Sequence, residues 1–279
     1  MAHGILGLDH ALIGVRDLAA ARAAWERLGF VAAPLGRHVG RSTGNHCLMF
    51  PRDYLELIGI VDPAGPPSRL AGLLAERGEG VIGAALAAAA ESARASFAAA
   101  GLEPPPVAEL RRPSVNGELR FRLAELPAEA TPDLRLFVCE HETPELLRRP
   151  EWLDHPNGAV GLRSVVVAVA DPAARQAGLE RLFGAGSTAS TDDVVTVFSG
   201  RHRLLFVTEQ DLAFLHPQLE LAPGPVPRGA ALSVEVRDLD RAARLLERAG
   251  VDFAETGAAL QVPPELASGV ALSLVPAAP

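Results

Sequence analysis

One histidine, His10, lies in an apolar run over residues 8–15 that reads LDHALIGV. An imidazole in such a run is either a buried, hydrogen-bonded core residue or a metal ligand. Shifts of 72, 154 and 221 positions align this segment with three later segments, which carry Ile82, Ser164 and Ala231 at the same position. A polar group that the fold required would recur in these copies. Its loss therefore favours the metal-ligand interpretation of His10.

A glutamate, Glu56, lies among apolar residues in the segment YLELIGI, residues 54–60. A carboxylate buried there is costly unless it is paired, for instance with an arginine, or bound to a metal. The corresponding segments of the third and fourth copies read RLLFVTE and VALSLVP, so this acid is missing where the histidine is missing. Their joint absence indicates a joint role, and we predict that both residues bind one divalent metal.

The elements that would position these residues recur in one order. A buried strand precedes a helix that Asp17 caps and Gly29 ends, with apolar residues at helical spacing between them. Short strand-like runs follow, and the hairpin of the third copy turns at residues 199–202. The order predicts an α+β fold of four tandem βαβββ modules. The strands expected in the first module cover residues 8–15, 30–33, 45–50 and 54–60.

This order, with LDHALIGVRDL carrying His10 and DYLELIGI carrying Glu56, resembles the vicinal oxygen chelate superfamily and, within it, the glyoxalase-like domain proteins. Glyoxalase I, type I extradiol dioxygenases and bleomycin-resistance proteins belong to that superfamily. The resemblance implies a glyoxalase-like fold in which modules pair into two curved mixed-sheet cups. It implies a first domain over residues 1–141, a linker over 142–160 rich in Pro, His and Trp, and a degenerate second domain over 161–279.

The resemblance also implies that the second module completes the metal site. Its last strand, LRLFVCEH, ends in Glu140 and His141, and alternation lets only one of them face the cup. We predict His141, because two imidazoles and one carboxylate leave open positions on a transition metal. An edge pair that faces solvent is the alternative. Glyoxalase I carries ligands on both first strands, and this chain departs from it there.

Other histidines are open to simpler interpretations. His46 lies on the third strand of the first module, where it could line the cup and bind substrate, or could be a plain strand residue. His155 and Asn157 are expected to shape a turn. His38, in a glycine-rich loop, and His202, at a hairpin tip, are expected to be solvated.

Arginine is the only strongly basic residue type, since the chain contains no lysine and no Schiff base can form. Arg37, Arg41 and Arg120 could each pair with a substrate carboxylate, and the sequence does not select among them. A net charge of −8 argues against nucleic acid as a partner. Two cysteines form no disulfide framework, and the first residues lack signal-peptide features, so a cytoplasmic location away from membranes is expected.

Taken together, the sequence predicts a metal-dependent lyase, isomerase or dioxygenase that acts on a small molecule with two adjacent oxygens. Its cofactor would be a divalent ion of zinc, manganese, iron, nickel or cobalt that acts as a Lewis acid. The first alternative is a metal-free binding or sequestering protein of the same fold. The second is an interaction module whose alanine-rich helices form a homodimer face.

Overall fold

The computed structural model describes residues 2–278 and shows an α+β fold built on a large, curved, open mixed sheet. The first half contains two blocks, each a strand, a helix and three strands. The first block holds β1 (Gly7–Gly14), α1 (Leu18–Arg27), β2 (Gly36–Arg37), β3 (Thr43–Met49) and β4 (Tyr54–Ile60). The second holds β5 (Gly80–Ala87), α3 (Ala90–Ala99), β6 (Ala108–Ser114), β7 (Gly117–Glu125) and β8 (Arg135–His141). The other helices of this half are η1 (Ala2–Gly4), α2 (Arg69–Arg77) and η2 (Ala128–Ala130).

The second half has the same order of elements. Its first block holds β9 (Ala159–Ala168), η3 (Ala173–Arg175), α6 (Gln176–Phe183), β10 (Thr188–Thr191), β11 (Val194–Ser199) and β12 (His202–Val207). Its second block holds β13 (Arg228–Val236), α8 (Leu239–Arg248), β14 (Ala254–Thr256), β15 (Ala259–Val262), η4 (Pro264–Leu266) and β16 (Ala271–Pro276). Three more helices are α4 (Pro144–Leu147), α5 (Pro150–Leu153) and α7 (Glu209–Leu215).

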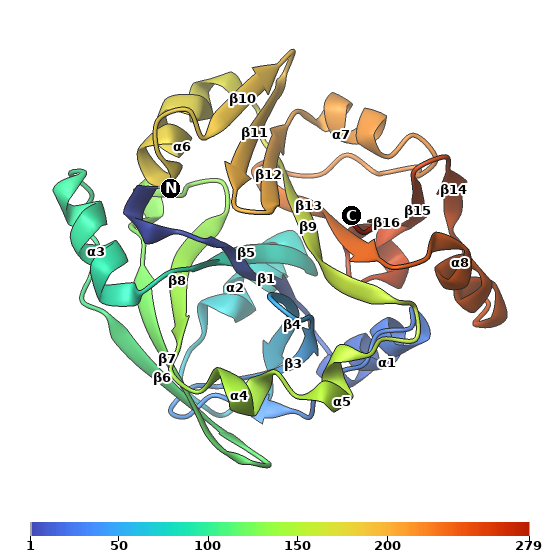
Figure 1. Ribbon diagram of the computed structural model, residues 1–279, viewed down its shortest axis with the longest axis horizontal. Helices are drawn as coiled ribbons and strands as arrows, with labels where there is room; N and C mark the ends of the chain where they lie inside the picture. The colour runs from blue at the N-terminus through green and yellow to red at the C-terminus, as the bar shows by residue number, and fades with distance from the viewer. Residues whose placement is uncertain (1, 279) are drawn as a thin grey trace.

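Blocks pair through their first strands. β1 runs antiparallel to β5, and β9 runs antiparallel to β13, so each half forms one curved sheet. The two sheets meet where Gly229 of β13 pairs with Val81 of β5. A Cβ at Gly229 would lie 2.5 Å from the Val81 carbonyl oxygen, so this close approach requires glycine. These four strands lie in the centre of Figure 1, between the blue-to-green half and the yellow-to-red half.

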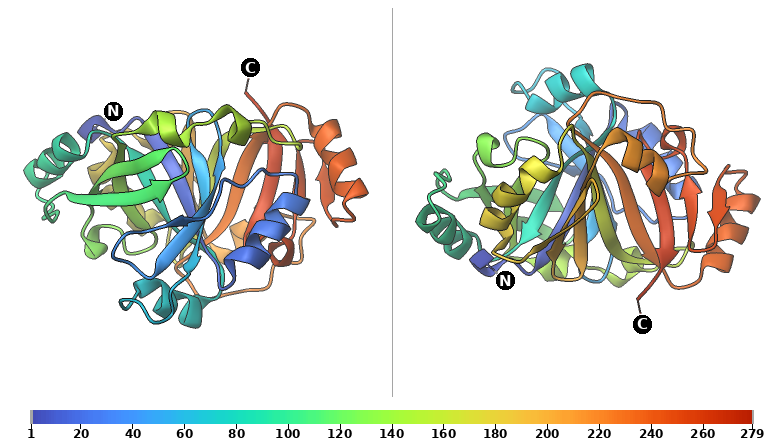
Figure 2. Two further views of the ribbon diagram at one scale, coloured as in Figure 1. Left: turned by 90° about the horizontal axis from the view of Figure 1, so that it is seen from below. Right: turned by 90° about the horizontal axis from the view of Figure 1, so that it is seen from above.

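One hydrophobic core joins the halves. It contains side chains from one face of both sheets together with those of α1, α3, α6 and α8, such as Trp25, Phe97, Leu179 and Leu246. The opposite face of each sheet carries its own smaller cluster. Figure 2 shows α3 and α8 at opposite ends of the molecule, outside the two curved sheets. The Trp25 indole N–H donates to the Ser268 hydroxyl at 3.2 Å, so a buried hydrogen bond also joins the two halves.

Local signals explain where most elements begin and end. The Asp17 carboxylate accepts hydrogen bonds from the Ala19 and Ala20 amides, as the capping prediction requires, and β4 has the predicted bounds. The strand expected over residues 30–33 is absent. The Val31 amide donates to the His155 ring and the Ala33 amide to the Cys47 carbonyl of β3, so this segment makes one bond to the linker and one to β3 and forms no strand ladder.

The segment between the halves is structured. It contains α4 and α5, and its last residues are buried against the first half. His155 also contacts the Met49 carbonyl at 2.8 Å, while Asn157 donates to the Leu28 carbonyl and accepts from the Ala159 amide. The Gly158 amide donates to the His155 carbonyl at 2.8 Å and closes the turn that was predicted here. Across residues 2–278, no helix combines the length and apolar character needed to span a membrane.

Candidate functional site

The concave face of the first half holds the chemically active residues. Because side chains alternate along a strand, even-numbered positions of β1 and β4 and odd-numbered positions of β3 and β8 face the same side. A cavity of about 70 Å³ opens there. Its polar and charged lining residues are His10, His38, Arg41, Thr43, Asn45, Tyr54, Glu56, Arg112, Arg135 and Cys139, and its apolar ones are Leu12, Ile58, Leu110, Phe121, Leu123 and Phe137.

His10 and Glu56 lie side by side in this cavity. The His10 Nε2 atom is 3.3 Å from a Glu56 carboxylate oxygen, and both side chains are more than nine-tenths buried. The register of β1 and β4 produces this contact, since Glu56 pairs with Leu12, two residues beyond His10 on the same face. The structure thus brings together the two residues whose joint absence from the later copies suggested a joint role.

Asp9 holds the other side of the His10 ring. One Asp9 carboxylate oxygen lies 2.8 Å from His10 Nδ1 and 2.8 Å from His141 Nε2, and the second oxygen lies 3.6 Å from the Arg148 guanidinium. The pairing of β1 with β5 shifts register between Leu8 and His10. Such a bulge redirects a side chain that strict alternation would place on the opposite face. Asp9 was not among the site residues predicted from the sequence, because no local signal marks the bulge.

Asn45 links Glu56 to a buried arginine. Its amide nitrogen donates to the second Glu56 carboxylate oxygen, and its amide oxygen accepts from Arg112. Arg112 also donates to the Cys47 sulfur at 3.7 Å. His38 completes this side of the cavity: its Nδ1 lies 2.8 Å from the Thr43 hydroxyl, and its Nε2 lies 3.8 Å from Glu56.

The buried charges shift one another's pKa. Burial alone would lower the pKa of His10, but hydrogen bonds to Asp9 and Glu56 outweigh it and raise this pKa to about 9. Burial would raise the pKa of Glu56, yet the hydrogen bond from His10 and the nearby positive charges lower it to about 2. The pKa of Asp9 is likewise well below its ordinary value, because the attraction of His141 and the hydrogen bonds from both histidines overcome burial. Burial lowers the pKa of His38.

Aromatic rings fix the imidazoles. Tyr54 stacks on His10 with ring centroids 4.4 Å apart, and Phe137 meets the same ring edge-on at 5.8 Å. Phe121 packs against His141 at 4.9 Å. Rings packed on several sides restrict the histidine rotamers, so the orientation of Nε2 toward Glu56 is set before any ligand binds.

The predicted third ligand lies on the other side of His10. His141 is in contact with Asp9 near Nδ1, whereas Glu56 faces Nε2. Ligand atoms of Asp9, Cys139 and His141 lie within 4.8 Å of one another, and this is the one set of three or more such residues that comes so close within residues 2–278. The set of His10, Glu56 and His141 remains a prediction. Glu140, the alternative, accepts a hydrogen bond from the Ala90 amide.

Of three other histidines, His38 and His202 differ from expectation, and His46 takes the plain strand position that was its alternative interpretation. His46 does not line the cavity, because it follows Asn45 on β3 and so points to the opposite face, where its Nδ1 contacts the Ala33 carbonyl at 2.8 Å. His38 is buried in the cavity wall rather than solvated. His202 is also buried, and there it accepts from the Leu8 amide and contacts Asp53 at 3.1 Å.

Of the three arginines predicted as partners of a substrate carboxylate, only Arg41 lines the cavity. Arg41 lies at the exposed rim of the cavity, whereas Arg37 donates to the Val61 carbonyl and Arg120 pairs with Glu142 on the surface. The buried arginine of the cavity is Arg112, which the sequence analysis did not single out. It comes from β6 of the second block, so only the pairing of blocks brings it to Glu56.

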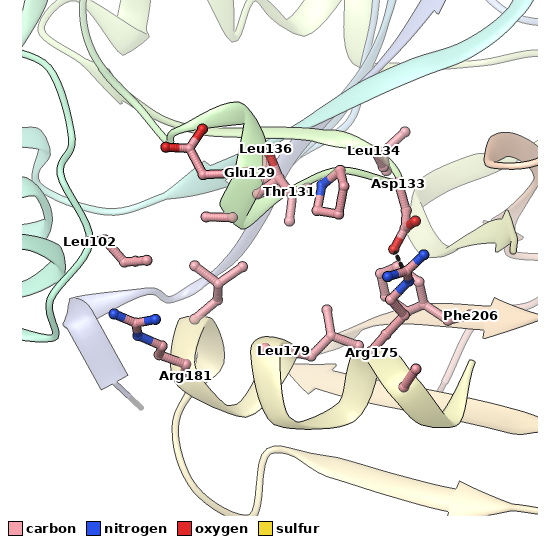
Figure 3. A pocket seen from close by; sticks show the side chains of 15 residues that line it. Leu102, Glu129, Thr131, Asp133, Leu134, Leu136, Arg175, Leu179, Arg181 and Phe206 are labelled. Atoms are coloured by element: carbon pink, nitrogen blue, oxygen red, sulfur yellow. Dashed lines mark ion pairs between the residues drawn. The ribbon is translucent and has the colours of Figure 1, made fainter. Parts of the chain in front are cut away.

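A larger cavity of about 220 Å³ lies between the halves, against α6 (Figure 3). Figure 3 shows Asp133 facing Arg175 across a 2.8 Å ion pair, with Arg181 farther along the helix. The rest of its wall is mostly apolar, and it contains neither histidine nor cysteine. The smaller cavity is therefore the candidate site, because it gathers the ionisable groups.

The concave face of the second half has different contents. Ser164 and Ala231 occupy the positions that correspond to His10, and the cluster on this face consists of Val, Ala and Leu side chains. Leu212 of α7 belongs to this cluster, and Leu219 and Leu221 pack against it. The chain itself thus fills this face with apolar side chains.

Comparison with known families identifies one match. A family model described as a glyoxalase-like domain matches residues 8–183, which include both blocks of the first half. No protein of curated function matches the chain at a significant level.

Solved structures share the fold. A hypothetical protein from Staphylococcus aureus superposes with a TM-score of 0.70 at 10% identity, over 97% of this chain and 99% of that one. A variant of 4-hydroxymandelate synthase from Streptomyces coelicolor gives 0.58 at 16% identity, over 91% and 77%. A fusion of a xylose isomerase-like TIM barrel with 4-hydroxyphenylpyruvate dioxygenase gives 0.56 at 16%, over 91% and 40%. At these identities the likeness is one of fold.

Proposed function

Because the chain belongs to the glyoxalase-like domain family, we propose that it is a metal-dependent enzyme that acts on a small molecule with two adjacent oxygens. The His10–Glu56 pair would be the centre of its metal site. Two of the structural neighbours are named as a synthase and a dioxygenase fusion, which makes dioxygenase chemistry one option beside lyase and isomerase chemistry.

The spacing of His10 and Glu56 is the observation that carries this proposal. Two ligand atoms that each lie about 2.0–2.2 Å from one ion are roughly 3 Å apart. The observed separation of 3.3 Å between His10 Nε2 and a Glu56 oxygen fits a shared ion. Asp9 on Nδ1 supplies the partner that metal-bound histidines usually have.

The third donor is a choice between two histidines. His141 was predicted from the sequence, but it faces Asp9 and lies beyond the Nδ1 side of His10. His38 lines the cavity, its Nε2 is 3.8 Å from Glu56, and its lowered pKa keeps it neutral and able to coordinate. We propose His38 as the third donor because it lines the same cavity as His10 and Glu56, while His141 would hold Asp9 in place.

A bound divalent ion would supply Lewis-acid stabilisation of a developing negative charge on the substrate. The protein's own residues do the rest. Asp9 keeps the His10 proton on Nδ1, Asn45 fixes one Glu56 oxygen, and the apolar wall of Phe121 and Phe137 excludes water.

A metal-free binding protein is the second candidate function. The raised pKa of His10 and the lowered pKa of Glu56 show that these residues can also satisfy each other as a buried ion pair. In that case the cavity would bind a small molecule without an ion.

Metal content separates the two functions. Protein purified without chelators would be analysed for metals, and calorimetry would then follow titration with Zn, Mn, Fe(II), Ni and Co under controlled redox conditions. We expect binding that His10→Ala and Glu56→Gln abolish and that the controls His3→Ala and Glu142→Gln retain. His38→Ala should weaken binding more than His141→Ala. If wild type binds none of these ions more tightly than His10→Ala, the metalloenzyme proposal is wrong.

A further inference from the structure

Arg112 is a buried cation without a carboxylate partner. Its side chain is 5% exposed and lines the cavity, and no ion pair joins it to an acid among residues 2–278. Its Nη1 donates to Asn45 and Cys47, while its Nε is buried with no hydrogen-bond acceptor. The other arginine of the wall, Arg135, already pairs with Glu125.

Leaving such a group unpaired is costly. A buried guanidinium without an acceptor on Nε loses its hydration and gains only part of the bonding it can make. Nη1 is already engaged and Nε is enclosed by the protein, so Nη2 is the nitrogen that a ligand in the cavity can reach. A carboxylate oxygen bound there would accept a charge-assisted hydrogen bond. A carboxylate on a ligand would therefore satisfy what the protein leaves unsatisfied.

The surroundings define the rest of the ligand. The cavity wall beside Arg112 is mostly apolar and aromatic, and includes Leu110, Phe121 and Phe137. Asn45 bridges Arg112 and Glu56, so Arg112 and the His10–Glu56 pair line the same cavity.

We propose that Arg112 recognises a carboxylate of the substrate, so that the cup takes a small monocarboxylate with an apolar body. That this ligand is a substrate rests on the proposed function, whereas carboxylate binding by Arg112 does not. Gly36 supports this assignment. A Cβ on Gly36 would lie 2.5 Å from both Cδ and Nη1 of Arg112, so the glycine leaves the room that the guanidinium occupies.

Two matched probe pairs test the proposal: benzoate against benzamide, and isobutyrate against isobutyramide for a narrower cavity. Each pair differs in charge and hardly in shape. Affinities would be measured by calorimetry or ligand-observed NMR on full-length protein in excess chelator. For at least one pair, we expect wild type to prefer the carboxylate about tenfold or more.

The variants use neighbouring residues as controls. Arg112→Gln should bring the preference close to one, and Arg112→Lys should give an intermediate value because it keeps charge without the fork. Arg111→Gln removes the same charge one residue away on the exposed face, where Arg111 pairs with Glu109, and should keep the wild-type preference. Gly36→Ala should reduce the preference without removing any charge, and it serves if Arg112→Gln fails to fold.

The outcomes separate this inference from the proposed function. If neither pair shows a preference in wild type, or if Arg112→Gln and Gly36→Ala keep the preference, the carboxylate site is wrong. It is equally wrong if Arg111→Gln abolishes the preference. Carboxylate preference in a protein that binds no metal would leave this inference standing and remove the metalloenzyme proposal.

Discussion

Two buried carboxylates contact the two nitrogens of the His10 ring. Glu56 faces Nε2 across 3.3 Å, and Asp9 binds Nδ1 at 2.8 Å. In the proposed metal site an ion would lie between His10 Nε2 and Glu56, and Asp9 fixes a proton on Nδ1. The chemistry of the site therefore depends on which side of one imidazole each acid occupies.

The first prediction concerns pH and the metal-free protein. The folded-state pKa of His10 is about 9, above the ordinary histidine value of 6.5. The stabilisation from the protonated ring is therefore complete below pH 6.5 and is lost as pH rises toward 9. Urea unfolding in chelator should show the free energy of unfolding falling across this window in wild type and less steeply in His10→Gln. Equal slopes in the two proteins would contradict the prediction.

The second prediction concerns Asp9. Asp9→Asn removes the negative charge on Nδ1, so the pKa of His10 should fall and metal affinity should weaken by roughly 10–100-fold. NMR titration of His10 measures the first effect, and calorimetric titration with the ion that wild type binds most tightly in the metal screen measures the second. The control is Asp62→Asn, which changes an exposed carboxylate of the loop after β4. An unchanged His10 pKa in Asp9→Asn would show that Asp9 does not act through this ring.

At the scale of elements, β1 and α1 carry the site and its support. The bulge in β1 turns Asp9 toward His141, and α1 packs Trp25 into the shared core behind the strand. The helix begins where Asp17 accepts from two amides that no helical carbonyl can satisfy. Local capping thus contributes to the position of the strand that holds His10.

The third prediction is that Asp17→Ala lowers the free energy of unfolding by about 1 kcal/mol, the usual cost of losing a helix cap. Asp240→Ala is the control, because Asp240 lies in the first turn of α8 without being its cap residue. Chemical denaturation followed by circular dichroism measures both variants. A larger loss in Asp240→Ala would contradict the capping argument.

At the scale of the whole molecule, the halves share one core and buried polar contacts. His202 of the second half bonds to the Leu8 amide and to Asp53, and Asp53 also accepts from the Leu162 amide. The site strands of the first half are therefore backed by the second half. The predicted division is into residues 1–141, 142–160 and 161–279. The first and last of these segments contribute side chains to one continuous hydrophobic core.

The fourth prediction follows from this continuity. Unfolding of one half exposes core surface of the other, so the protein should unfold in a single transition. Calorimetry, circular dichroism and tryptophan fluorescence should report coincident midpoints. Two separated transitions would show that the halves are energetically independent domains.

The fifth prediction tests the second half as a scaffold. Ser164→Ala should leave metal affinity and benzoate binding unchanged, because the concave face around Ser164 is filled by apolar side chains of the chain itself. Both measurements would be made beside wild type at matched thermal stability. A clear loss in either would move the search for a site to the second half.

The sequence by itself determined the strand and helix that begin the first block, the cap of α1 and the bounds of β4, and it singled out His10 and Glu56, which the structure places in contact. Each rests on local periodicity, on a capping residue or on comparison between copies. Such signals depend on neighbours along the chain, and the alternation of side chains follows from strand geometry alone. They were therefore available before any long-range contact was known.

Only the tertiary structure decided which other residues join that pair. Asp9 depends on a bulge, Arg112 on the pairing of two blocks, and His38 on the fold of a loop. His46 shows the limit of strand reasoning, because its neighbour Asn45 faces the cavity while it faces the core. Register, bulges and loop paths are set by contacts between residues far apart in sequence, so no local pattern encodes them.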